Sequence, residues 1–188
     1  MLFRSSSHGF AATGVYSIRV TAVDKDGGSD SKDVMVVVYD PTGGFVTGGG
    51  WINSPAGAYT PNPLLTGKAT FGFVSKYQKG ATTPSGETEF EFLVGNFKFR
   101  STSYQWLVVS GARAQFKGFG TVNGAGAYGF LLTATDGQVN GGGNVDKFRI
   151  KIWSDAGVIY DNVIGASDDL DVASPQIISG GSIVVHAK

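Results

Sequence analysis

The chain lacks the residues on which several kinds of chemistry depend. Its 188 residues include no cysteine, which excludes disulfides, thiolate nucleophiles and cysteine-ligated metal sites. Histidine occurs only as His8 and His186, near opposite ends of the chain. We therefore expect neither a histidine-rich metal site nor a histidine-based catalytic triad in the middle of the chain.

Charge is scarce and balanced. Only 16% of the residues are charged, and 15 Lys and Arg residues face 15 Asp and Glu residues. Zero net charge argues against nucleic acid or an anionic membrane as the main partner. No apolar run approaches the ~18 residues of a membrane-spanning helix, so membrane insertion is not expected. The first residues also contain no apolar run of signal-peptide length.

Glycine and aromatic residues are abundant, and their pattern predicts the fold class. The chain has 29 Gly and 12% aromatic residues, including 13 Phe. Short alternating segments are separated by clusters of Gly, Asn, Asp and Pro, and no helical pattern of useful length occurs. The sequence therefore predicts an all-β fold, an antiparallel β-sandwich that is jelly-roll-like or a partly closed barrel.

The alternation also assigns the two faces of several strands. Apolar and charged residues alternate in four segments, which places one acidic row and three basic rows on the outside. We expect opposite charges on neighbouring strands to pair, at about 0.2–1 kcal/mol per pair. The rows are Glu87, Glu89 and Glu91; Lys98 and Arg100; Arg113, Gln115 and Lys117; and Lys147, Arg149 and Lys151.

The N-terminal segment forms a candidate domain of its own at residues 1–41. Residues 15–23 alternate, the segment Asp24–Gly28 has turn chemistry, and residues 33–39 form a Val-rich strand. Together with His8-Gly9-Phe10 and Gly14-Val15-Tyr16, this pattern resembles the C-terminal half of a PKD domain. That family is an immunoglobulin-like β-sandwich of secreted and cell-surface proteins. The resemblance implies a truncated immunoglobulin-like two-strand segment, an extracellular or cell-surface location, and a longer exported parent protein. The unpaired strand edges predict pairing with the second domain, self-association with another copy of the chain, or disorder.

Residues 42–188 form the second candidate domain. They resemble a glycine-rich β module of bacterial exported proteins, which has no settled activity. The resemblance rests on segments such as Gly48-Gly49-Gly50-Trp51-Ile52, residues 104–109 and Asp146-Lys147-Phe148-Arg149-Ile150. It supports the same setting and implies no catalytic residue.

One glycine motif and one row of carboxylates resemble functional motifs but have ordinary structural interpretations. Gly124 to Gly129 match the G-x-G-x-x-G pattern, but a strand-like run follows them where a dinucleotide site needs a helix, so we expect a hairpin turn. The row Glu87, Glu89 and Glu91 is compatible with a two-carboxylate glycosidase. A row beside basic strands stays ionised, however, whereas a catalytic acid needs a raised pKa, so we do not expect an enzyme.

Two groups of residues are candidate binding sites. Trp51, Trp153, Tyr59 and Tyr77 lie near loops or in outward rows, and exposed aromatic rings can stack on sugar rings. The alternative is that the tryptophans cover the ends of the core, whereas Trp106 is expected inside it. The oxygen-rich cluster Asp161, Asn162, Asp168, Asp169 and Asp171 suits calcium, and its alternative is an acidic surface loop.

The sequence leaves two functions open. One is a non-catalytic extracellular module that binds carbohydrate or a cell-surface polymer, with or without calcium. The alternative is a purely structural or adhesive spacer or self-assembly domain of a larger exported protein.

Overall fold

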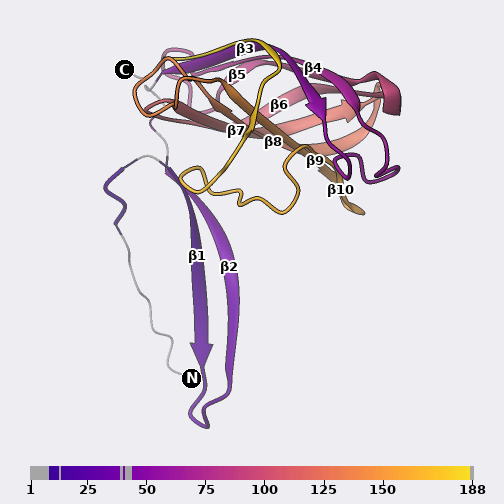
Figure 1. Cartoon of the computed structure of the whole chain (residues 1–188). Helices are drawn as coiled ribbons and strands as arrows, with labels where there is room; N and C mark the ends of the chain where they lie inside the picture. Colours follow the sequence, from indigo (N-terminus) through magenta and orange to yellow (C-terminus); the bar gives the residue numbers. More distant parts are fainter. Residues whose placement is uncertain (1–8, 13, 39, 41–43, 187–188) are drawn as a thin grey trace.

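The computed structural model describes residues 9–12, 14–38, 40 and 44–186. These residues form strands β1 to β12 and one short 3-10 helix, η1 (Leu93–Gly95), which confirms the all-β prediction. In Figure 1 a two-stranded hairpin projects away from a large curled sheet. The predicted boundary between residues 41 and 42 lies outside the described residues.

The projecting hairpin is the two-strand segment that the sequence predicts. It pairs β1 (Gly14–Val23) with β2 (Ser29–Val38) in antiparallel register. Asp24 shapes the turn, because its Oδ1 accepts hydrogen bonds from the backbone N–H groups of Asp26 (2.9 Å) and Gly28 (2.8 Å). Within the described chain no third strand pairs with β1 or β2, so both outer edges of the hairpin are open.

The large sheet is an antiparallel meander whose ends are brought close together. Each strand from β3 to β10 pairs with the next, and β12 returns to pair with β3, while the short β11 pairs with β9. This order corresponds to the predicted partly closed barrel, since a jelly roll needs Greek-key connections. The strands are β3 (Phe45–Ser54), β4 (Gly67–Lys76), β5 (Ser85–Phe92), β6 (Phe97–Ser110), β7 (Arg113–Val122), β8 (Ala125–Thr135), β9 (Lys147–Ser154), β10 (Gly157–Asp161), β11 (Gln176–Ile177) and β12 (Gly180–His186).

A phenylalanine-rich core fills the inside of the curled sheet. Alternate residues of every long strand point inward, as the period-two pattern predicts. Strands far apart in the sheet order meet there: the ring centroids of Phe71 on β4 and Phe148 on β9 are 4.0 Å apart. Phe90 on β5 likewise packs against Tyr160 on β10, at 4.6 Å. The curl is therefore held by aromatic contacts across the barrel interior.

The glycine motif and the charged rows of β5 and β6 follow the sequence predictions. Asn123 and Gly124 turn the chain between β7 and β8 with φ of 51° and 79°, a backbone that Asn and Gly tolerate best. Across β5 and β6, Lys98 pairs with Glu91 at 2.5 Å, and Arg100 pairs with both Glu87 and Glu89. The Gly-rich turn and the pairing of opposite charges are both confirmed.

Two buried carboxylates close the gap beside β12. Asp146 Oδ2 accepts a hydrogen bond from the backbone N–H of Ile183 (2.7 Å), and Asp136 Oδ2 accepts one from Val185 (2.9 Å). Asp146 Oδ1 also accepts a bond from the N–H of Gly137 (2.8 Å). Among the described strands only β3 pairs with β12, and the β8–β9 connection supplies hydrogen-bond acceptors to the other edge of β12.

Replacing Asp146 with alanine should destabilise the barrel. The change leaves two buried N–H groups without acceptors, and we expect the free energy of unfolding to fall by about 2–4 kcal/mol in urea titrations. Glu87→Ala removes an exposed carboxylate from β5 and should cost about 1 kcal/mol or less. Equal losses for the two variants would contradict the role given to Asp146.

Candidate functional site

The outer face of β7, β8 and β9 carries an ordered array of side chains. The strand register places residues of the three strands opposite one another in rows that run across the sheet. Each row takes one residue from each strand, so its members are neighbours on the same face. The rows are Gln115–Thr133–Arg149, Lys117–Leu131–Lys151 and Phe119–Gly129–Trp153.

Residues 162–175, here called the covering loop, lie across part of this face. Gln115 is fully buried and Arg149 is only 2% exposed, although the sequence places both in outward rows. They do point away from the phenylalanine core, as predicted, but they do not reach solvent. The outward direction of these rows is confirmed, but the prediction that they lie on the outside is wrong for Gln115 and Arg149. A loop without regular structure forms a second layer over them, and strand periodicity does not detect such a layer.

Arg149 holds the start of the covering loop through a buried ion pair. Its Nε and Nη2 donate to the two carboxylate oxygens of Asp161, at 2.9 and 2.8 Å. Nη1 and Nη2 also donate to the backbone oxygens of Ser167 (2.8 Å) and Ala166 (3.2 Å). Asp168 Oδ1 lies 3.1 Å from Nη2, outside hydrogen-bond geometry. Burial opposes the charge of Arg149, but its hydrogen bonds with Asp161 and the two nearby carboxylates outweigh burial and raise its pKa.

Further side chains attach the covering loop to the strands. Asn162 accepts a hydrogen bond from the N–H of Ile150 (2.8 Å) and donates to the oxygen of Phe148 (3.0 Å), so its amide replaces a strand partner for β9. Arg113 donates to the backbone oxygens of Leu170 and Asp171, both at 2.9 Å. The loop is therefore bonded along most of its length.

The oxygen cluster that predicts calcium has other partners here. Asp161 is occupied by Arg149, Asn162 bonds β9, and Asp168 binds Lys151 at 2.6 Å. Asp169 accepts a bond from the N–H of Asp171 (2.9 Å), and Asp171 is exposed. Within the part of the chain that the structure describes, no three Asp, Glu or His side chains are placed to hold one ion. Calcium stays a prediction, and at Asp161 it would have to displace a buried guanidinium.

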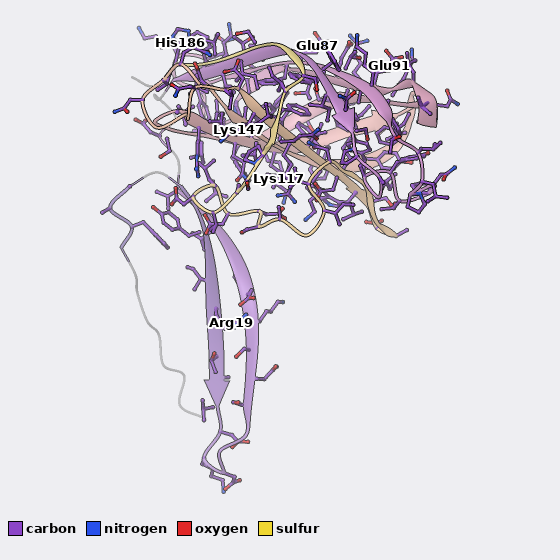
Figure 2. All side chains as sticks on the ribbon, in the orientation of Figure 1. Arg19, Glu87, Glu91, Lys117, Lys147 and His186 are labelled. Carbon is purple, nitrogen blue, oxygen red and sulfur yellow. The ribbon has the colours of Figure 1, made fainter. Side chains whose placement is uncertain are left out.

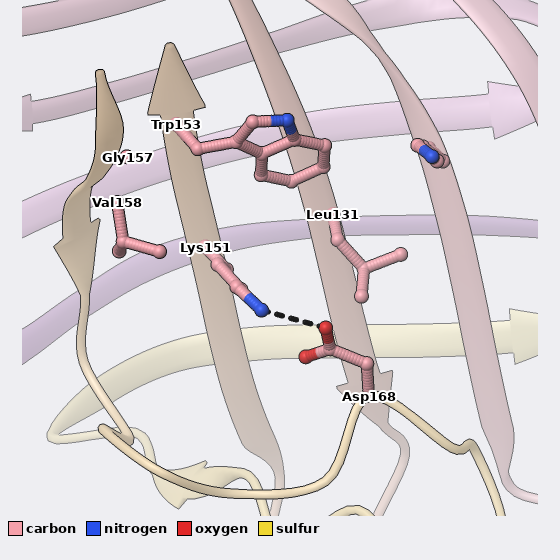
Figure 3. A pocket seen from close by; sticks show the side chains of 7 residues that line it. Leu131, Lys151, Trp153, Gly157, Val158 and Asp168 are labelled. Atoms are coloured by element: carbon pink, nitrogen blue, oxygen red, sulfur yellow. Dashed lines mark hydrogen bonds and ion pairs between the residues drawn. The ribbon is translucent and has the colours of Figure 1, made fainter. Parts of the chain in front are cut away.

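A pocket of about 320 Å³ opens beside Asp168 of the covering loop. Figure 3 shows the Trp153 indole on one side, Leu131 and Val158 near it, and the Lys151–Asp168 ion pair at the loop. The indole lies against Gly129, where any side chain would collide with it. Lys117 also lines the pocket, and its Nζ lies 5.5 Å from the centroid of the Trp153 ring. The pocket thus combines an aromatic ring and aliphatic side chains with ammonium and carboxylate groups.

The four predicted aromatic residues do not form one platform. Trp51 lies on β3, against Gly180 and below Lys68 at 4.9 Å, and it does not line the pocket. Tyr59 packs edge-on against the core ring Phe97, with centroids 5.5 Å apart. Tyr77 accepts a hydrogen bond from the backbone N–H of Leu107 at 3.2 Å. Only Trp153 lines the pocket, and Tyr59 and Tyr77 pack against the core instead.

Trp106 also departs from the sequence prediction. It was expected inside the core, but it is half-buried on the outer face with Val108 and Leu170 of the covering loop. Val37 of the hairpin packs against the same small cluster. Residues 104–109 of β6 are apolar on both sides because both sides are covered. One side packs in the barrel interior, and the other packs beneath the covering loop and the base of the hairpin.

The positions of some pocket residues could be predicted from the sequence. The basic rows and their continuation to Trp153 place Lys117, Lys151 and Trp153 on one face. Leu131 had a signal too, because β8 is apolar on both sides and its outward residues need a cover. No pattern in the sequence marks Val158 as a residue that lines a pocket.

Comparisons with family models, with curated proteins and with solved structures find no match to this chain, so its own geometry carries the interpretation. In the described residues no helix has the length and hydrophobicity needed to cross a membrane.

Removing the partner of Arg149 should release the covering loop. Asp161→Ala leaves a buried guanidinium without its main counter-charge, and we expect a loss of about 3–5 kcal/mol in unfolding free energy. Backbone amides of residues 163–172 should also exchange hydrogen faster. Asp171→Ala is the matched control in the same loop, since this carboxylate is exposed and only its backbone bonds Arg113. An Asp161 variant as stable and as protected as the Asp171 variant would contradict this role.

Proposed function

We propose that the chain is a non-catalytic binding module that takes up a saccharide at the Trp153 pocket. The observation that carries the proposal is a half-buried indole that lines one open pocket together with aliphatic and charged side chains. The apolar face of a sugar ring stacks on such an indole, and hydroxyl groups at its rim find donors and acceptors. Lys151 and Asp168 provide these groups at the loop side of the pocket.

A binding role is also supported by how the remaining charges are used. The three glutamates of β5 are engaged in ion pairs with Arg100 and Lys98 on the neighbouring strand, so these carboxylates serve the sheet. Most of the polar groups at the covering loop are engaged in holding it. We place the module in an extracellular or cell-surface protein, and this setting rests on the resemblance of its N-terminal segment to a PKD domain. Calcium is not required by the proposal.

Trp153→Ala should abolish saccharide binding. We expect the unchanged chain to be retarded in native gels that contain a soluble polysaccharide, and the variant to run as in a gel without it. Trp51→Ala is the matched control, because Trp51 also lies against a glycine and beneath a lysine but outside the pocket. Retardation that survives in the Trp153 variant and is lost in the Trp51 variant would place the site elsewhere.

The hairpin favours a second candidate function, a structural or adhesive module that self-associates. Val20 and Val34 are 56% and 42% exposed, and they lie on neighbouring strands whose outer edges are open. Open edges with exposed apolar residues are sites at which a further strand can pair. A second copy of the chain could supply that strand.

Sedimentation velocity across a range of concentrations tests this candidate. Self-association through the hairpin predicts a sedimentation coefficient that rises with concentration, and Val20→Lys together with Val34→Lys should prevent the rise. Phe119→Lys, on the exposed part of β7, is the control and should leave it unchanged. A strictly monomeric chain would remove the self-assembly version of this function.

A further inference from the structure

Two neighbouring rows of the outer face, Gln115–Thr133–Arg149 and Lys117–Leu131–Lys151, carry one cation more than the carboxylates that pair with them. Arg149 pairs with Asp161 and Asp168, and Lys151 pairs with Asp168. Lys117 completes the set, which therefore holds three cations and two carboxylates. In the part of the chain that the structure describes, no carboxylate lies within ion-pair distance of Lys117.

Arg149 and Lys151 receive their carboxylate partners from outside the three strands. Where the loop lies over the strands, the loop and the end of β10 bring Asp161 and Asp168 to the basic rows. Asp168 lines the loop side of the pocket, and beyond it Lys117 and Trp153 lie on neighbouring rows, with the Lys117 Nζ 5.5 Å from the centroid of the Trp153 ring. An anionic ligand in the pocket would therefore stand beside Lys117 as Asp161 stands beside Arg149 and Asp168 beside Lys151.

We propose that the pocket selects an anionic saccharide, whose ring stacks on Trp153 and whose carboxylate or sulfate group binds the Lys117 ammonium. The inference rests on the saccharide-binding function proposed above and adds the class of ligand. An anionic group makes a charge-assisted hydrogen bond with Lys117, whereas a neutral sugar offers this ammonium group no opposite charge. Lys117 and Lys151 both line the pocket of about 320 Å³, but Lys151 is paired with Asp168, so one unpaired cation is left for one charged ring. A nucleic acid strand, by contrast, needs a series of cations along its backbone.

Calorimetric titration of the full chain with four probes tests the inference. The probes are a trisaccharide of galacturonic acid, a sulfated galactose trisaccharide, the neutral galactose trisaccharide and a short oligo-dT. We expect one or both anionic sugars to bind roughly tenfold or more tightly than the neutral one, with the preference reduced by added salt. The comparison of the two anionic sugars identifies which charged group the site takes.

Lys117→Met keeps the aliphatic stem of the side chain and removes its charge. This variant should lose the preference and bind the anionic and neutral sugars with equal affinity. Lys68→Met is the matched control, because Lys68 lies over Trp51 outside the pocket, and it should keep the preference.

The outcomes separate the two proposals. Equal binding of anionic and neutral sugars by the unchanged chain, lost in Trp153→Ala, would overturn the choice of ligand class and leave the binding function standing. Binding of none of the sugars would overturn both. Tight binding of oligo-dT that depends on Lys117 would replace the saccharide with a nucleic acid.

Discussion

The buried guanidinium of Arg149 joins the two layers of the outer face. It comes from β9, whose other side packs the core, and it bonds Asp161 and the backbone of residues 166 and 167. A charge at this depth is tolerated only with its partners in place. The position of the covering loop depends on this pair, and with it the edge of the pocket, because Asp168 reaches Lys151 from the same loop.

A second constraint is the sidedness of the sheet. Each long strand sends alternate residues into the phenylalanine core and the others outward, so a single register decides both sets. The row with Trp153, Gly129 and Phe119 exists because β7, β8 and β9 are in that register. Figure 2 shows that side chains are packed closely together in the barrel, whereas those of the hairpin extend with few other side chains near them. The fold thus presents a sheet face with a pocket and a projecting hairpin with open edges.

Much of this architecture could be predicted from the sequence, and the limits of prediction have physical causes. Alternation is a local signal, so it correctly gave the strand class, the charged rows and the outward position of Lys117 and Trp153. The path of residues 162–175 has no such periodicity, and its location depends on long-range partners such as Arg149 and Asn162. For the same reason the sequence, which made the acidic residues of the loop candidate calcium ligands or an acidic surface loop, did not show that Arg149 pairs with Asp161. Asp136 and Asp146 were missed too, because edge capping by a carboxylate depends on which strand returns beside the β8–β9 connection.

The central claim is that ligand binding occurs at the part of the outer face that the covering loop leaves open. Two-dimensional NMR of the labelled chain during titration with the galacturonic acid trisaccharide tests this most directly, because each tryptophan has its own indole N–H signal. The account predicts that the Trp153 indole signal and the amides of Lys117 and Leu131 shift together to saturation while the Trp51 indole signal stays in place. Shifts centred on Trp51, or a spectrum that does not change at all, would contradict it.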